Sequence, residues 1–342
     1  VTVNDGAQGE TGQDGQNCTL VSNGNGTSTL TCPDGSSIIL STGDATTDTV
    51  LYGDYEIRNS LDAVALLPYT EITGGLTIQA DGLTAISLPN LRTVGYEIQI
   101  AARDLQSFEA PELTSVGSYF NVYNSELSTL SLPSLVDLNS FSISSYNNAG
   151  QYLETLSLPL VTELTDGFWL GRANNLTTLD LSSLETVGTF YLWKAWALET
   201  LSLPNLVTAG DISFHSLHFL NEISMPQLTT VGHFSLDTTW APVLNLPALL
   251  YAKSMSVEFN PNLQSIALDV LEEVDDDFEI IANRQLTELS APQLNKVMRL
   301  IFNSNPSATV LSLTGLNHVE DRVMIYENMK LHTIDIPNLQ TV

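Results

Sequence analysis

A run of acidic residues near position 275 is the part of the sequence with the clearest capacity for chemistry. Glu273, Asp275, Asp276 and Asp277 place several carboxylates within one short segment. Calcium binds several oxygen ligands gathered around one turn, so this segment is a candidate calcium site, and a solvated acidic turn is the alternative. The histidines show no spacing that forces convergence on a metal, and no other metal site is predicted.

Sequence signatures of catalysis are absent from the chain. It contains no Gly-x-Ser-x-Gly nucleophile motif, no phosphate-binding Gly-Lys-Ser/Thr loop and no His-Glu-x-x-His zinc motif. We therefore predict that the protein is not an enzyme and that it has no catalytic residues. No organic cofactor is expected.

Aromatic residues in the middle of the chain form the second candidate site. Trp169 and Tyr191 are separated by one period of the repeat described below, and Trp193 and Trp196 follow closely. Exposed Trp and Tyr give rigid, amphipathic contact area for sugars or proteins, whereas the alternative is that such pairs only strengthen a sheet. Two further residues at the same repeat position indicate a second contact patch: Ile301 and Met324.

An internal repeat sets the positions of these acidic and aromatic residues in the fold. The segment 88–95 (LPNLRTVG) returns as segment 110–117 (APELTSVG), and related segments follow to the end of the chain at steps close to 22 residues. A Leu-rich repeat of this period is typical of a solenoid, in which each unit buries its apolar residues only against its neighbours.

Each unit contains two short runs in which apolar and polar residues alternate, which is the pattern of β-strands. The proline that follows Leu-x-Leu cannot donate to a ladder and ends the second run. The glycine that follows the valine of each repeat predicts a corner at which the backbone has positive φ. We therefore expect an all-β, right-handed leucine-rich-repeat β-solenoid of about 13 turns of ~22 residues, with neighbouring turns about 4.8 Å apart.

The motif Leu-Pro-x-Leu-x-x-Val-Gly, followed by an alternating apolar pair and Asn, resembles the receptor L-domain branch of leucine-rich repeats. That branch occurs in insulin-receptor-type ectodomains and in fungal and bacterial cell-surface proteins. The resemblance covers about residues 55–342, and the solenoid domain is assigned to residues 51–342. It implies a flattened β-helix with ligand or partner contacts on a sheet face. The cysteine-rich flanks of the receptors are missing here.

The N-terminal part of the chain differs from the repeats. Residues 1–16 contain a Gly-x-y run, GAQGETGQDG, that resembles the collagen-like junctions of bacterial surface proteins, and a flexible Gly-rich leader is the alternative. Residues 17–50 contain two β-prone runs around Asn-Gly steps, which predict a hairpin. A disulfide between Cys18 and Cys32 at its base would place the protein in an oxidising compartment.

The charge balance limits the partners. The chain carries 39 acidic and 11 basic residues, a net charge of −28, so it lacks the cations that neutralise nucleic acid or an anionic membrane. No apolar run is long enough to insert into a membrane, and no signal peptide begins the sequence, which indicates a mature chain or a piece of a longer one. We predict an extracellular or cell-surface location.

The last repeat matches the consensus without a polar cap. Its apolar positions include Pro337, Leu339 and Val342, and uncapped strand edges favour further pairing. Head-to-tail stacking of copies would cover this end, and the β-prone residues Val1 and Val3 are candidates for the covering strand. Truncation or a continuing native chain would explain the same feature.

Two functions are consistent with these patterns. The first is a non-enzymatic extracellular structural protein, in which the solenoid is a spacer or a head-to-tail fibre unit and the partner is another copy of the chain. The alternative is a surface adhesin or receptor that binds a glycan or a protein through the exposed aromatic face.

Overall fold

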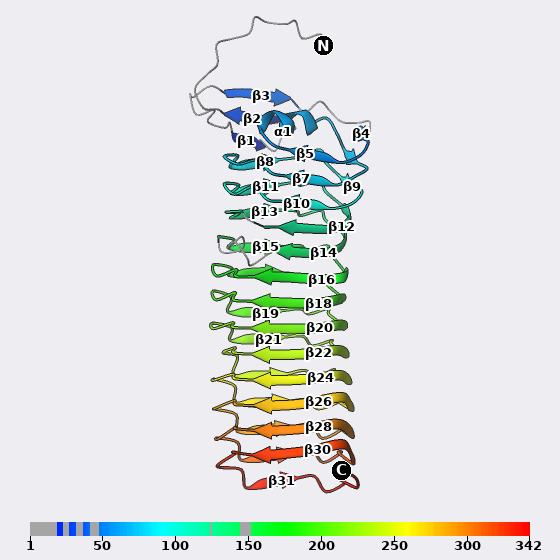
Figure 1. The fold of residues 1–342 in the computed structure, drawn as a ribbon, viewed down its shortest axis with the longest axis vertical. Helices are drawn as coiled ribbons and strands as arrows, with labels where there is room; N and C mark the ends of the chain where they lie inside the picture. Colours follow the sequence, from blue (N-terminus) through cyan, green and yellow to red (C-terminus); the bar gives the residue numbers. More distant parts are fainter. Residues whose placement is uncertain (1–18, 23–26, 32–36, 42–47, 124, 144–151) are drawn as a thin grey trace, which may run out of the picture.

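The protein is a β-solenoid, as the repeat predicts (Figure 1). The computed structural model describes residues 19–22, 27–31, 37–41, 48–123, 125–143 and 152–342. About 13 turns of roughly 22 residues stack along one axis with parallel strand pairing. The described residues form a single helix, α1, and it is neither long nor apolar enough to cross a membrane.

The broad face of the solenoid is a 16-stranded parallel sheet (Figure 1). In spatial order its strands are β5 (Tyr55–Ile57), β7 (Leu76–Ile78), β10 (Ile98–Ile100), β12 (Ser115–Val122), β14 (Asp137–Ile143), β16 (Glu163–Gly171), β18 (Thr186–Trp193), β20 (Thr208–His215), β22 (Thr230–Asp237), β24 (Tyr251–Glu258), β26 (Glu273–Ile281), β28 (Lys296–Asn303) and β30 (His318–Tyr326), with β4 (Val50–Leu51), β6 (Glu71–Ile72) and β9 (Thr93–Val94) at one side.

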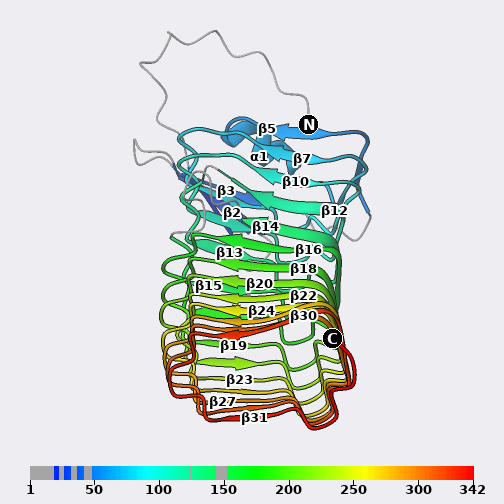
Figure 2. The ribbon, with the colours of Figure 1, turned by 60° about the horizontal axis from the view of Figure 1, so that its bottom comes forward.

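The opposite face consists of short strands in four separate sheets; in Figure 2 several of them, such as β23 and β31, are seen below the long strands. They are β8 (Ala85–Ser87) with β11 (Ser107–Glu109) and β13 (Thr129–Ser131); β15 (Thr155–Ser157) with β17 (Thr178–Asp180); β19 (Thr200–Ser202) with β21 (Glu222–Ser224); and β23 (Val243–Asn245) with β25 (Ser265–Ala267), β27 (Glu288–Ser290), β29 (Val310–Ser312) and β31 (Thr333–Asp335). Each ends just before the Leu-Pro step of its repeat or the equivalent position, as proline requires.

The core is continuous along the axis because every turn contributes the same buried columns. One column contains a run of phenylalanines in which neighbouring ring centroids lie 5.0 to 5.6 Å apart. Its members are Phe120, Phe141, Phe168 and Phe190, all fully buried. Stacked aromatic pairs contribute about 1 kcal/mol each beyond the apolar area that they bury, so identical turns reinforce one another.

A second column in the C-terminal half is polar and fully hydrogen-bonded. Asn260, Asn283 and Asn305 are completely buried, and the backbone N–H of each donates to the side-chain oxygen of the next Asn at 2.9 to 3.1 Å, ending at Asn328. Each Nδ2 donates in turn to a strand carbonyl, such as that of Val257 for Asn283 at 2.8 Å. Because every partner is satisfied, this buried polar ladder supports the stack.

The corner glycines correct one expectation from the sequence. Residues such as Gly117 and Gly232 do not have positive φ. A Cβ on either would lie 2.0 Å from the carbonyl oxygen of the glycine one turn earlier, so glycine is needed because neighbouring turns approach closely.

Positive φ occurs instead at a different corner, directly after the long strands, and at residues that are not glycine. Their φ values lie between 54° and 58°: Arg172, Lys194, Ser216, Thr238, Phe259, Ala282, Ser304 and Glu327. The backbone N–H of each of the first seven donates to a carbonyl of the next turn, as Arg172 does to Trp193 at 2.7 Å. These bonds offset the cost of the left-handed conformation, about 1–2 kcal/mol per residue.

The N-terminal end of the stack is covered by α1 (Ser60–Leu66), which buries Ala63 and Leu66 against the first turns (Figure 1). Its N-cap is Asn59, whose side-chain oxygen accepts from the backbone of Leu61 at 2.8 Å. The repeat pattern is poorly matched in this segment, and the helix was therefore not predicted from the sequence.

Three further strands precede the solenoid and pair antiparallel in the order β1 (Thr19–Ser22), β2 (Thr27–Thr31), β3 (Ser37–Ser41). The sequence predicted only the first hairpin. Thr19 pairs with Thr31 at the base of that hairpin. Cys18 and Cys32, and the collagen-like residues 1–16, lie outside the described residues.

One junction in the stack is incompletely paired. At the corner before most long strands, a backbone N–H donates to the turn before it, as Val136 does to Thr114 and Glu185 does to Thr162, at 2.9 and 2.8 Å. Among the described residues, no such bond joins Val136 to Thr162 or Glu163, and β14 pairs with β16 only from Ser140 onward. The separation leaves a hollow lined by Val136, Asp137, Leu138, Asn139, Thr162, Glu163 and Thr165.

Removing one amide from the buried ladder should destabilise the solenoid. In Asn283→Ala the backbone N–H of Asn260 and the carbonyl of Val257 lose their partners, which costs about 2 to 4 kcal/mol of unfolding free energy for two unsatisfied buried groups. Urea denaturation measures the change. Asn205→Ala, which removes two hydrogen bonds at an exposed position, should cost less than about 1 kcal/mol, and equal effects of the two changes would contradict the assignment.

The incomplete junction should exchange its amide hydrogens early. We expect the amides of Thr162 and Glu163 to exchange at least about tenfold faster than those of Glu185 and Val207, which are bonded to the preceding turn. Hydrogen–deuterium exchange resolved by residue tests this, and uniform protection along the corner would show that the junction is closed in solution.

Candidate functional site

The strand register brings the aromatic residues together. Trp169 pairs with Tyr191 across β16 and β18, and the column continues through Ser213 and Ser235. All these side chains point away from the core because the residues on either side of each are buried. The column that the repeat predicted is therefore present on the broad face.

Trp169 lies on an open part of that face. Its neighbours two positions away in the strand are Gly167 and Gly171, neither of which carries a side chain. A Cβ on Gly167 would lie 2.8 Å from the indole Cη2 atom, so the ring extends over the backbone of Gly167. Gly167 also has a φ of +151°, which glycine adopts most easily. Trp169 therefore lies low across the strand as a half-buried platform.

Tyr191 and Trp193 extend this platform on the next strand, and both are half-buried. The ring of Tyr191 lies 5.9 Å from that of His215, and burial raises the pKa of its hydroxyl. Two cations rest on Trp193: the guanidinium carbon of Arg172 is 5.5 Å and Nζ of Lys194 is 4.7 Å from the ring centroid. We call Trp169, Tyr191 and Trp193, with Arg172 and Lys194, the tryptophan patch.

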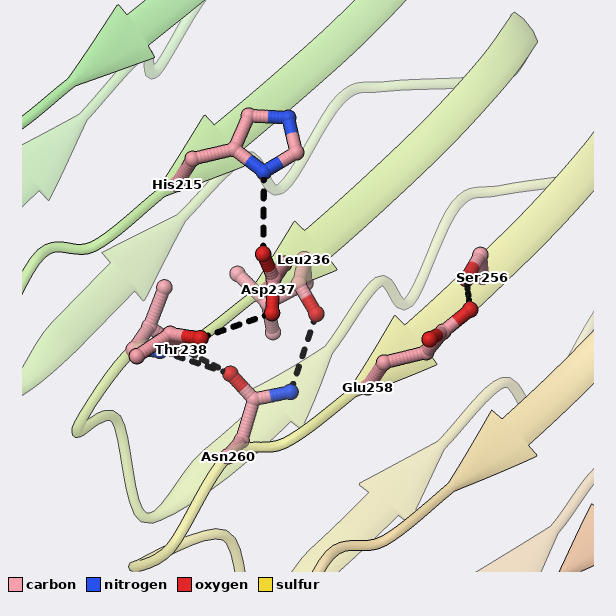
Figure 3. A network of polar contacts seen from close by, with 8 residues as sticks. His215, Leu236, Asp237, Thr238, Ser256, Glu258 and Asn260 are labelled. Atoms are coloured by element: carbon pink, nitrogen blue, oxygen red, sulfur yellow. Dashed lines mark hydrogen bonds and ion pairs between the residues drawn. The ribbon is translucent and has the colours of Figure 1, made fainter.

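The patch ends where the face becomes polar (Figure 3). Nδ1 of His215 lies 3.3 Å from a carboxylate oxygen of Asp237, whose other oxygen accepts from the Thr238 hydroxyl at 2.7 Å. In the next turn the Ser256 hydroxyl donates to Glu258 at 2.6 Å. Each of these carboxylates thus has a partner within the surface.

A second aromatic group lies around the corner from the patch. Trp196 and His218 have nearly parallel rings 5.9 Å apart, and His218 lies 6.0 Å from Trp240, which also contacts Phe219. Trp196 and Trp240 are 38% and 40% exposed. Trp196 therefore belongs to this edge group and not to the sheet face. Sequence reasoning missed Trp240, although its distance from Trp196 is two repeat periods.

The second contact patch expected from the sequence is not present as predicted. Ile301 and Met324 do pair in the outward column. Ile301, however, is only 8% exposed, because the column neighbours Glu279 and Met324 flank it within one strand spacing on each side. It cannot offer a contact surface, and Met324 alone is half-exposed.

The acidic residues near 275 do not converge on one point. Lys296 pairs with Glu273 at 3.3 Å, Arg299 pairs with Asp277, and the Tyr251 hydroxyl donates to Asp275. That hydrogen bond, the principal cause, raises the pKa of Tyr251 to about 12. No group of three or more His, Cys, Asp or Glu side chains in the described part of the chain is arranged to hold a metal. Calcium binding at Glu273, Asp275, Asp276 and Asp277 stays a prediction.

The predicted assembly end lies on the last turn. Ile334 on β31 is 53% exposed, whereas Leu311, one turn earlier in the same column, is fully buried. Pro337 and Val342 are exposed and Leu339 is half-buried. Val1 and Val3 lie outside the described residues, and the end-to-end contact stays a prediction.

Comparison with known proteins adds little to this description. No protein-family model matches the chain, and no curated protein matches it. The crystal structure of a leucine-rich cell surface protein from Faecalibacterium prausnitzii aligns with 93% of this chain and 94% of its own, at 10% identity and a TM-score of 0.25. The surface features of the chain itself must therefore indicate its function.

The outward column also contains a carboxylate in an unfavourable place, and its removal should stabilise the fold at neutral pH. Burial, followed by the nearby charges of Asp277 and Glu258, raises the pKa of Glu279, while Arg299 opposes the shift. A carboxyl with a raised pKa in the folded state destabilises that state once it ionises, and this penalty disappears as the pH falls below the pKa of the unfolded chain.

Glu279→Gln should therefore raise the midpoint of thermal unfolding at pH 7, and the difference should vanish near pH 4. Circular dichroism at the two pH values measures it. Glu288→Gln, at an exposed site on β27, should change the midpoint little at either pH. A neutral or destabilising effect of Glu279→Gln at pH 7 would contradict the electrostatic argument.

Proposed function

We propose that the protein is a non-enzymatic extracellular binding module, a rigid rod that presents the tryptophan patch to carbohydrate. The observation that carries this proposal is the extension of the Trp169 ring over the backbone of Gly167, beside Tyr191 on the neighbouring strand. Pyranose rings have apolar faces of C–H groups, and aromatic rings that lie low on a surface match them in shape and polarity. The hydroxyl and charged groups around the patch supply hydrogen bonds to sugar hydroxyls.

The rod supports this role by rigidity. Trp169 and Tyr191 lie in the middle of the continuous sheet, between buried Phe168 and Leu170 on one strand and Phe190 and Leu192 on the next. Because the side chains below are locked by packing, the rings are held in place before a ligand arrives, which lowers the entropic cost of binding.

A spacer is the second candidate function. The uninterrupted core from the first turns to the last favours it, since a rod of stacked turns separates its two ends by a fixed distance whether or not it binds a ligand. Assembly of copies end to end would extend the same role, and analytical ultracentrifugation across a concentration series tests for it.

Loss of the patch rings separates the two functions. We expect the double change Trp169→Ala, Tyr191→Ala to reduce binding to carbohydrates on a glycan array by at least about tenfold, because stacking residues dominate such contacts. The circular dichroism spectrum should be unchanged. Trp240→Ala removes an equally large exposed ring outside the patch and should leave binding intact. Absence of carbohydrate binding by the unaltered protein would leave the spacer as the better account.

A further inference from the structure

The two cations of the tryptophan patch occupy equivalent positions in consecutive turns. Arg172 follows the last residue of β16 and Lys194 follows the last residue of β18, each with the left-handed φ of the corner column. The other six residues of that column are Ser216, Thr238, Phe259, Ala282, Ser304 and Glu327. Among these eight described residues, the two basic side chains therefore occur where the turn borders Trp169, Tyr191 and Trp193.

Trp193 holds both cations at the edge of the platform. Cation–π contacts at 5.5 and 4.7 Å keep the guanidinium of Arg172 and the ammonium of Lys194 beside the sheet face. Among the described residues, Lys194 forms no salt bridge. Its ammonium can donate to a ligand while it remains over the ring.

The surrounding charge makes this pair unusual in the molecule. The chain has 11 Lys and Arg residues against 39 Asp and Glu residues. Asp237, two strands from Trp193 in the same column, already interacts with His215 and Thr238. A ligand with one or a few carboxylates is attracted to such a local site, whereas a long polyanion is repelled by the rest of the surface.

We propose that the ligand of the patch is a glycan with a carboxylated sugar at or near its end. The ring of that sugar lies on Trp169 and Tyr191, and its carboxylate binds Arg172 and Lys194. This inference rests on the proposed carbohydrate-binding function and specifies the class of sugar. Charge-assisted hydrogen bonds from a guanidinium and an ammonium are the strong contacts for a carboxylate.

The backbone geometry favours a sugar over an acidic peptide. Peptides that bind to sheets often add a strand to an unpaired edge. Here β16 is paired with β14 and β18, and β18 is paired with β16 and β20. No backbone edge is available in the patch, so recognition depends on ring faces and the two cations.

A matched pair of oligosaccharides tests the proposal. Trigalacturonate and its methyl ester have the same rings and differ in charge. Isothermal titration calorimetry of the full chain should show trigalacturonate binding at least about tenfold more tightly, with an advantage that shrinks as salt rises from about 0.02 to 0.5 M. Equal binding of the two would overturn the carboxylate assignment and leave carbohydrate binding standing. Failure of both, together with a blank glycan array, would remove the proposed function itself.

Two double variants locate the interaction. Arg172→Gln with Lys194→Gln should reduce affinity for trigalacturonate by at least about tenfold and leave the weaker affinity for the methyl ester unchanged. Lys253→Gln with Arg284→Gln removes the same amount of charge at exposed positions outside the patch and should have little effect. Equal losses in the two double variants would mean that net charge alone controls binding. Tighter binding of a short polyglutamate than of trigalacturonate would make the ligand an acidic peptide and overturn the proposal.

Discussion

Every feature of this protein depends on one constraint: a single turn cannot bury its own apolar side chains. Leu311 is fully buried because a turn lies on each side of it, while Ile334, in the last turn that the structure describes, is 53% exposed. Stability is therefore a sum of contacts between neighbours, and it requires each turn to repeat the shape of the one before. The phenylalanine stack, the asparagine ladder and the corner glycines are three ways in which the sequence meets that requirement.

The same constraint organises the surface. Because the register between long strands is nearly constant, residues about 22 positions apart become neighbours at strand spacing. A short stretch of repeats can therefore build a patch from one or two substitutions per turn. The tryptophan patch arises in this way from β16 and β18, and the acidic and ion-paired part of the face arises from β24 to β30 by the same rule.

Much of this was predictable from the sequence. Period and alternation define the turns, their strands and the outward column that contains Trp169 and Tyr191. The sequence could not reveal the burial of Ile301, because exposure at an outward position depends on the size of the neighbours in adjacent turns. The sequence also could not show why the corner residues are glycine, since a close approach between neighbouring turns and a positive φ both favour glycine. Helix α1 was missed because it occupies a turn in which the repeat has decayed, and the cation–π pair required side-chain positions that spacing alone does not give.

The left-handed corner residues have a consequence for how such a surface can change over generations. Arg172, Ser216, Phe259 and Glu327 differ in size, polarity and charge, yet their φ angles agree within a few degrees. The fold thus tolerates nearly any side chain there, and each one projects at a regular interval along the rod. Substitutions at these evenly spaced positions can therefore change the binding specificity of the surface while the solenoid keeps its fold.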